Sequence, residues 1–247
     1  MVDTREDGAL EMVSGAWLRR WSPAPLAQRW MEVRRLRAAC VRTRSVVLTY
    51  DDGPGKVLTP KVLELLATHG VHATFFLLGS RAVAHRDIAQ RIVDEGHEVG
   101  CHTHDHLSAW RVPSATAVAD IERGYQSLRQ WVRDDGLFRP PHGKVTSATR
   151  QALQRRGATV GWWTVDSGDT AEVLPDATIA ASHIVRAQGG VVLLHDFDRD
   201  ESDEENEQRA AFVLASTIAV LDAVQHQGFV VRTLGSVLEV VERSGHG

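Results

Sequence analysis

The chain has 247 residues, of which 43% are hydrophobic, and its formal net charge is −4. This length and hydrophobic share suit one domain with a sizeable core plus an appendage. The acidic balance gives no indication of a nucleic-acid partner. Two cysteines, Cys40 and Cys101, are too few for a disulfide framework, and there is no Cys-x-x-Cys zinc motif.

The first forty residues mix charged and apolar side chains throughout. They lack the basic start and the apolar core of a secretory signal. No apolar run approaches the ~20 residues that a membrane span needs. We therefore expect a cytoplasmic chain without a transmembrane segment.

Residues 1–43 are predicted to form a helical N-terminal extension, in which tryptophans alternate with arginines. Residues 25–40 have helical spacing, and four apolar side chains fall near one face: Leu26, Trp30, Val33 and Leu36. One interpretation is a basic amphipathic helix lying on a membrane surface. The other is a helix packed against the outside of the main domain, with its arginines solvated. We favour the second, because the apolar face is narrow.

From residue 44 to residue 247, predicted strands and helices alternate. The predicted strands cover residues 46–50, 73–78, 98–101, 137–138, 158–165, 191–194 and 229–232. The predicted helices cover residues 60–69, 81–95, 114–133, 147–156, 175–188, 209–227 and 237–241, with Thr59 as the cap of the first. Repeated strand-then-helix units predict an α/β domain with a parallel sheet, open or closed into a barrel. The acidic run 198–207 is predicted to be a solvated, mobile loop.

Two adjacent carboxylates, Asp51 and Asp52, follow the first apolar strand, and Gly53-Pro54 then ends it. Strand ends of this kind are where α/β folds place their active sites. Because neighbours on a strand point to opposite faces, the backbone must turn if both carboxylates are to reach one site. The alternative is that both aspartates only cap the turn before the next helix.

Three histidines occur within residues 102–106, directly after another predicted strand. His102 and His106 have the i, i+4 spacing by which one helical turn offers two imidazoles to a metal. Imidazole nitrogen and carboxylate oxygen together suit a divalent ion such as zinc. The same turn would point His104 and Asp105 elsewhere, so neither is counted as a ligand. Exposed loop histidines are the alternative.

Three further clusters lie at the ends of predicted strands: residues 139–143, 163–170 and 193–196. The first is a rigid turn that can hold an arginine against a carboxylate or aim a backbone N–H at an oxyanion. The second carries two carboxylates that can orient a base or cap a helix. In the third, a histidine emerges directly from a buried strand. Taken singly, each also fits a structural role.

The order and type of these five blocks resemble the polysaccharide deacetylase family, carbohydrate esterase family 4. That family shows Thr-Phe-Asp-Asp-Gly-Pro, His-Ser/Thr-x-x-His, Arg-x-Pro-x-Gly, Asp-x-x-Asp-Trp and Leu-x-His-Asp blocks. This sequence has TYDDGP at 49–54, HTHDH at 102–106, RPPHG at 139–143, DSGDT at 166–170 and LLHD at 193–196. The resemblance covers roughly residues 44–235 and implies a distorted (β/α) barrel of mostly parallel strands.

The resemblance implies a role for each matching position in the first three blocks. Asp52, His102 and His106 would hold a divalent metal, usually zinc, with cobalt or nickel as alternatives. Asp51 would be the general base toward the attacking water. Arg139 would pair with Asp51 and aim it.

The remaining positions complete the implied site. The backbone N–H of His142 would help to hold the oxyanion, and Leu193 would line the pocket for the acetyl methyl group. His195 would be the general acid that protonates the departing amine. Asp169 would orient His195 and raise its pKa.

The implied activity is metal-dependent removal of acetyl groups from N-acetylated amino sugars or polysaccharide, so the expected partner is an acetylated carbohydrate. An acetamide is a poor electrophile, and its amine is a poor leaving group. A metal polarises the carbonyl and activates water, and an acid–base pair takes the proton of the water and protonates the amine. Two alternatives stay open: an O-acetyl esterase acting on an acetylated glycan, and a catalytically silent carbohydrate-binding protein. The sequence predicts no particular sugar, linkage or oligomeric state.

Four positions depart from the family pattern. They are Tyr50 in place of Phe, Cys101 in place of Asn, His142 in place of Tyr, and Thr170 in place of Trp. The metal and proton-transfer positions are intact, so we expect activity with an altered acetyl pocket and sugar platform. Since no leader is seen, we expect a soluble sugar intermediate or a nascent polysaccharide inside the cell as substrate.

Overall fold

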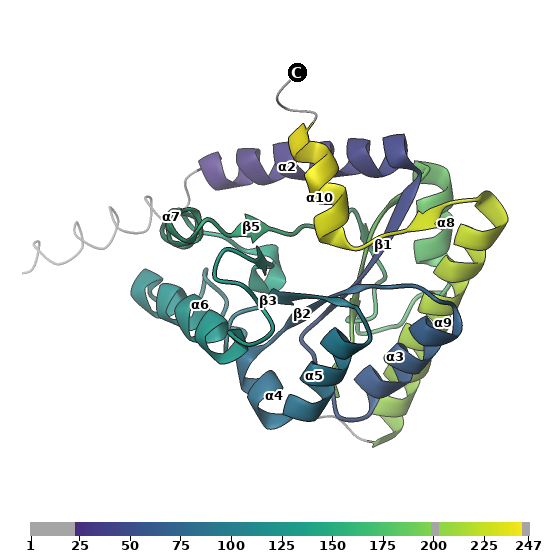
Figure 1. The fold of residues 1–247 in the computed structure, drawn as a ribbon, viewed down its shortest axis with the longest axis horizontal. Helices are drawn as coiled ribbons and strands as arrows, with labels where there is room; N and C mark the ends of the chain where they lie inside the picture. Colours follow the sequence, from purple (N-terminus) through teal and green to yellow (C-terminus); the bar gives the residue numbers. More distant parts are fainter. Residues whose placement is uncertain (1–22, 199–202, 244–247) are drawn as a thin grey trace, which may run out of the picture.

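The computed structural model describes residues 23–198 and 203–243 (Figure 1). Its strands form one sheet in the order β5-β4-β3-β2-β1-β7-β6, with β8 beside β1, and every pairing is parallel. The bounds are β1 Ser45–Asp51, β2 Thr74–Leu77, β3 Glu98–Cys101, β4 Leu137–Phe138, β5 Thr159–Val160, β6 Val165–Asp166, β7 Gly190–His195 and β8 Val230–Val231. The path ends at β5 and β6, which are not paired with each other in the described part of the chain. The predicted distorted (β/α) barrel is therefore confirmed.

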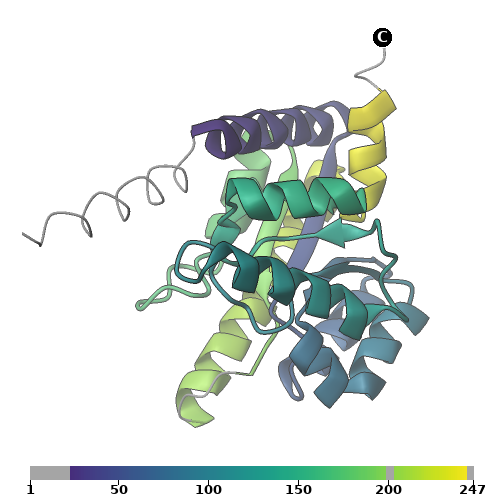
Figure 2. The ribbon, with the colours of Figure 1, turned by 90° about the vertical axis from the view of Figure 1, so that its left-hand side faces the viewer.

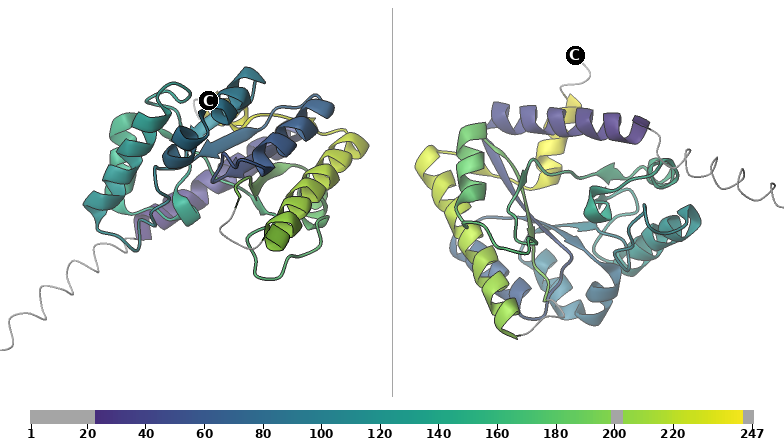
Figure 3. Two further views of the ribbon diagram at one scale, coloured as in Figure 1. Left: turned by 90° about the horizontal axis from the view of Figure 1, so that it is seen from below. Right: turned by 180° about the vertical axis from the view of Figure 1, so that it is seen from behind.

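Helices surround this sheet (Figures 1 and 2). Their bounds are α2 Pro23–Thr43, α3 Leu58–Thr68, α4 Gly79–Ala84, α5 Arg86–Asp94, α6 Ser114–Leu128, α7 Ser147–Arg156, α8 Ile179–Ala187, α9 Asp203–Gln227 and α10 Leu234–Arg243, with a short 3₁₀ turn, η1, at Pro141–Gly143. Figure 3 shows α3 and α9 on one flank and α6 on the other. No helix within residues 23–198 and 203–243 is long and apolar enough to cross a membrane.

Both faces of the central strands are buried, as is usual for a parallel sheet. In β1, Val46, Leu48 and Tyr50 belong to the core under the outer helices, whereas Val47 belongs to a second core that includes residues of α2 and α10. Because side chains alternate along a strand, Asp51 shares the face of Val47. The last residue of β1 therefore turns toward the barrel interior.

The predicted strand at residues 158–165 is wrong, because this segment forms β5 and β6 at opposite edges of the sheet. The Gly161 N–H donates to the Phe138 carbonyl at 2.8 Å, and the Thr164 N–H donates to the Val191 carbonyl at 2.9 Å. Within four residues the chain thus crosses from β4 to β7, and the buried Trp162 fills the crossing. A continuous apolar run does not reveal such a break.

The N-terminus of α3 is formed differently from the prediction. Thr59 is not its cap, because the Thr59 hydroxyl accepts from the Gly55 N–H and donates to the Asp196 carboxyl group. Asp198 instead accepts hydrogen bonds from the backbone N–H groups of residues 57 and 58, at 2.9 and 3.1 Å. Asp198 and the start of α9 both lie in the acidic run, so the predicted solvated loop is wrong for these residues.

Two other predicted helices differ in extent. The helix expected at 81–95 is divided into α4 and α5 at His85, whose φ of −126° and ψ of 57° are not helical. The helix expected at 175–188 is confined to α8, which begins at Ile179. Both segments are nevertheless helical, as the apolar spacing indicated.

The extension packs on the domain through α2, mainly by Leu36, Ala39 and Cys40. The predicted apolar face is wrong at its N-terminal end, because Leu26 is 50% and Trp30 63% exposed. The other two tryptophans of the predicted extension, Trp17 and Trp21, lie outside the described residues. The division of the chain at residue 43 stays a prediction. The two cysteines are separate buried thiols.

Candidate active site

The backbone turns sharply where β1 ends. Asp52 has a φ of +69°, an uncommon left-handed conformation for a residue other than glycine. The turn brings Asp52 into the same cleft as Asp51, which is what two adjacent strand residues require to share one site. Arg81 Nη1 donates to the Asp52 carbonyl at 2.8 Å and fixes the turn. At Gly53, a Cβ atom would lie 2.4 Å from Asp196 Oδ1, so only glycine fits there.

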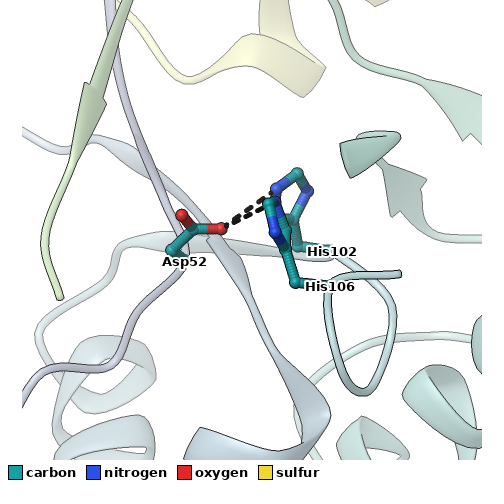
Figure 4. Close-up of side chains that lie close together, drawn as sticks. All are labelled: Asp52, His102 and His106. Carbon is teal, nitrogen blue, oxygen red and sulfur yellow. Dashed lines mark ion pairs between the residues drawn. The ribbon is translucent and has the colours of Figure 1, made fainter. Parts of the chain in front are cut away.

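The loop after β3 brings His102 and His106 toward Asp52 (Figure 4). His102 Nε2 lies 3.3 Å and His106 Nε2 lies 3.2 Å from Asp52 Oδ1. The predicted helical turn is wrong, because Thr103 and His106 have φ values of +73° and +58° in an irregular loop. Left-handed backbone at these two residues, and not a helical turn, therefore brings both imidazoles to Asp52.

This group of three side chains suits a cation. Asp52 Oδ1 is buried and has no hydrogen-bond partner among the described residues, although two imidazole nitrogens face it. One ligand atom from each residue lies within 4.8 Å of the others. His102 Nδ1 donates to the Arg139 carbonyl at 2.7 Å, which leaves Nε2 as the lone-pair nitrogen of a neutral ring. The chemistry of one carboxylate and two imidazoles matches a zinc-type site.

The electrostatics point the same way. Burial would raise the pKa of Asp52, but the neighbouring imidazoles of His102 and His106 outweigh burial and hold this pKa below its usual value. Burial and the charge of His102 lower the pKa of His106 to about 4. Near neutral pH the group therefore offers a carboxylate and an uncharged His106 imidazole, the forms that bind metals.

The other residues of the histidine loop face away, as predicted. His104 Nδ1 shares a hydrogen bond with the Ser127 hydroxyl at 3.0 Å. Asp105 pairs with Arg123. Neither belongs to the candidate metal group.

Asp51 is held by a buried arginine. Arg139 Nη1 donates to Asp51 Oδ1 at 2.7 Å and to the Thr49 hydroxyl at 2.7 Å, while Arg139 Nε donates to the Gly161 carbonyl at 3.1 Å. Arg139 is fully buried and Asp51 is 3% exposed. The other carboxylate oxygen of Asp51 lies 3.8 Å from His102 Nε2. Asp51 is thus aimed beside the candidate metal group.

His195 ends β7 in register with Asp51. Its Nδ1–H donates to Asp169 Oδ1 at 2.9 Å, and its backbone N–H donates to Asp169 Oδ2 at 2.7 Å. Burial alone would lower the pKa of His195, but the charge and hydrogen bond of Asp169, with the charges of Asp52 and Asp51, raise it to about 9. A pKa of about 9 keeps the His195 ring protonated near neutral pH.

One cleft of about 480 Å³ joins these groups. Seven of the nine predicted site residues line it, namely Asp51, Asp52, His102, His106, His142, Leu193 and His195. The other two, Arg139 and Asp169, contact Asp51 and His195 from behind. The ring of His142 lies 4.6 Å from that of His106. The structure brings all nine together, and their individual roles stay predictions.

Sequence reasoning missed three further residues that line the cleft, Leu78, Arg81 and Phe197, and assigned no role to Trp163 of the cluster 163–170, which also lines it. The Arg81 guanidinium lies 4.3 Å from the centre of the Phe197 ring, so these two form one wall. Phe197 directly follows the block 193–196, and this position was the available signal. Arg81 lies between blocks and carried none.

Comparison with known proteins places this arrangement in a family. The polysaccharide deacetylase model matches residues 38–161. The chain is 32% identical over 197 residues to a peptidoglycan-N-acetylglucosamine deacetylase of Bacillus cereus, covering 78% of this chain and 87% of the relative. It is 32% identical over 199 residues to a chitooligosaccharide deacetylase of Sinorhizobium fredii, covering 77% and 90% of the two chains. The chain belongs to the polysaccharide deacetylase family.

A solved structure of a carbohydrate esterase also resembles this fold. A family 4 carbohydrate esterase from Streptomyces lividans, in complex with acetate, superposes with a TM-score of 0.61 at 26% identity, covering 76% of this chain and 91% of that one. The family model ends at residue 161, before the segments that carry Asp169, Leu193 and His195. For these three, the local evidence is the geometry described above.

Proposed function

We propose that this protein is a metal-dependent hydrolase that removes the acetyl group from N-acetylated amino sugars, within an oligosaccharide or polysaccharide. One observation carries the proposal: the orphaned Oδ1 of Asp52 faces two imidazole nitrogens in a cleft that Asp51 and His195 also line. The two relatives named above are deacetylases of peptidoglycan N-acetylglucosamine and of chitooligosaccharides. The Streptomyces relative was solved with acetate, the small product that this reaction releases.

Asp52, His102 and His106 would hold the divalent ion, for which we propose zinc, with cobalt or nickel as substitutes. When bound, such an ion supplies Lewis acidity toward the acetyl carbonyl and toward water. Asp51, aimed by Arg139, accepts a proton from the attacking water. The backbone N–H of His142 donates to the developing oxyanion, and Leu193 packs against the acetyl methyl group.

His195 completes the reaction by giving its proton to the nitrogen of the departing amine. The Nδ1–H bond to Asp169 leaves Nε2 as the atom that donates this proton. A pKa raised to about 9 keeps His195 protonated at neutral pH, and the same proton is lost as the pH rises through that value. Asp51 at the end of β1 thus accepts one proton, and His195 at the end of the neighbouring β7 donates the other.

The test is release of acetate by the full chain with zinc and with a chelator. The substrates are an N-acetylglucosamine oligomer, an N-acetylated peptidoglycan fragment and an O-acetylated xylan. We expect acetate from the N-acetylated substrates, abolished by the chelator and by Asp51→Asn. Asp87→Asn, which makes the same change at an exposed aspartate outside the cleft, is the matched control. Acetate from xylan alone would establish an esterase, and sugar binding without any acetate would establish a silent binding protein.

A further inference from the structure

The outward side of α2 combines exposed apolar and cationic side chains. Ten large hydrophobic side chains are exposed in the described part of the chain, and four of them lie on this one helix: Leu26, Trp30, Met31 and Val41. Trp30, at 63% exposure, is the only aromatic among the ten. Isolated exposed apolar residues need no explanation, but a concentration on one helix indicates an interaction surface.

Arginines alternate with these apolar residues. Leu26, Trp30, Arg34, Arg37 and Val41 follow one another at steps of four, four, three and four residues, and so form one stripe along the helix. Arg34 lies over the Trp30 ring, with its guanidinium carbon 5.5 Å from the ring centre. Among the described residues, Arg34, Arg35 and Arg37 form no ion pair with a carboxylate.

The acidic residue of α2 is turned to the other side. Glu32 pairs with Arg150 at 3.0 Å and accepts from the Trp162 indole N–H at 2.6 Å, so it faces the domain. Leu36 and Cys40 are buried on that same side. One side of α2 therefore packs on the domain, and the opposite, basic and apolar side does not. Figures 1 and 2 show α2 along the edge of the molecule.

We infer that the outward stripe of α2, Leu26, Trp30, Arg34, Arg37 and Val41, with Met31 and Arg35 beside it, docks on an anionic membrane surface. Arginines beside Trp, Leu and Val are the composition by which amphipathic helices lie in the lipid interface. An anionic polymer such as nucleic acid would engage the arginines but would leave the apolar side chains without a favourable environment. The charge complementarity is local, because the chain as a whole has a net charge of −4.

The packed side of the same helix reaches the candidate site. Arg29 Nη1 donates to the carbonyl of Gly143, a residue of the cleft, at 3.0 Å, and the Arg29 guanidinium lies over the Trp162 and Trp163 rings. A helix with its side chains is about 10–12 Å wide. A docked α2 would therefore hold the cleft close to the lipid surface, where a membrane-attached glycan is within reach. This last step rests on the proposed function, whereas the docking itself does not.

The experiment is co-sedimentation of the full chain with vesicles of equal parts phosphatidylglycerol and phosphatidylcholine, against pure phosphatidylcholine. We expect binding to the anionic vesicles that weakens as salt is raised. Each arginine near such a surface contributes about fivefold in affinity, so Arg34→Gln/Arg37→Gln should bind roughly 25-fold more weakly. Trp30→Ser should also weaken binding, because it removes the largest apolar side chain of the stripe.

The matched control is Arg129→Gln/Arg133→Gln, which removes the same charge from exposed positions after α6. This control should bind vesicles like the unchanged chain, and acetate release by every variant in the absence of vesicles should be unaffected. The inference is overturned if the unchanged chain stays in the supernatant with the anionic vesicles. It is also overturned if Trp30→Ser binds normally while a DNA duplex competes fully, because the surface would then be a general polyanion site. Failure of acetate release with intact vesicle binding would refute only the proposed function.

Discussion

The two halves of the candidate site differ in what they lack. The half built on the ends of β1 and β3 contains a buried carboxylate oxygen of Asp52 with no partner, facing two imidazoles. In the half built on β6 and β7, the Asp169 carboxylate has its partners, because it accepts hydrogen bonds from both the ring and the backbone of His195. An unsatisfied buried group marks a place where another group belongs. The first half therefore offers a place for a cation, whereas the Asp169–His195 pair already has its hydrogen bonds.

The largest effect should follow from removing a ligand in the first half. His102→Ala should lose bound zinc and reduce acetate release to background, since outer partners of a metal site alone contribute ~10–100-fold in affinity and a direct ligand contributes more. His104→Ala is the control, because His104 contacts Ser127 outside the group. Elemental analysis of both variants measures the zinc. Unchanged zinc in His102→Ala would mean that His102 is not a ligand.

Asp51→Asn should be nearly as severe in activity without any loss of metal. The asparagine oxygen can still accept from Arg139, but it no longer takes a proton, so kcat should fall by about 10²–10⁴-fold. Circular dichroism at the assay temperature checks the fold, because the change leaves a buried arginine without its counter-charge. Normal turnover would remove Asp51 as the base.

A change in the second half should act on protons and leave the metal alone. Asp169→Asn removes the charge that most raises the pKa of His195, so this pKa should fall from about 9. The basic limb of the kcat profile should then move to lower pH, because the proton donor is lost earlier as the pH rises, and kcat at neutral pH should fall about 10²-fold. Zinc content should not change. If the basic limb of the kcat profile stays at the same pH, Asp169 does not set the pKa of the proton donor.

The smallest effect should come from Arg81, which holds the turn of Asp52 through its carbonyl. Arg81→Met keeps an apolar stem against Phe197 but removes the donor, and zinc affinity should fall about tenfold. Arg81→Lys should restore part of the affinity, because an ammonium group can also donate to the carbonyl. Competition with a zinc-binding dye measures both values. Equal affinities for all three chains would show that the turn holds without Arg81.

Local sequence was sufficient for much of this site. Strand ends carry Asp51, His102, Arg139 and His195, and parallel strands bring their C-terminal ends to one edge, so alternation of apolar runs and helices predicted their meeting. The strand 98–101 and the helix 147–156 were placed with their observed bounds. In each case the position of the strand or helix follows from the apolar pattern of a few adjacent residues.

What sequence reasoning missed depends on contacts between distant segments. Asp198 caps α3 from 140 residues away, and residues 161–164 leave an apolar run to cross between two strands. The positive φ of Asp52 is supported by Arg81, whose part of the sequence shows no motif. Leu26 and Trp30 were assigned to the packed face by periodicity, which locates an apolar stripe but not the partner that covers it.

The most direct test of the central claim is a zinc titration of the metal-stripped full chain with an N-acetylglucosamine oligomer as substrate. We predict that bound zinc and acetate release rise together and reach their limit at one ion per chain, and that neither rises in His102→Ala. Full acetate release before zinc is added, or stoichiometric zinc binding with no acetate released from any N-acetylated substrate, would contradict it.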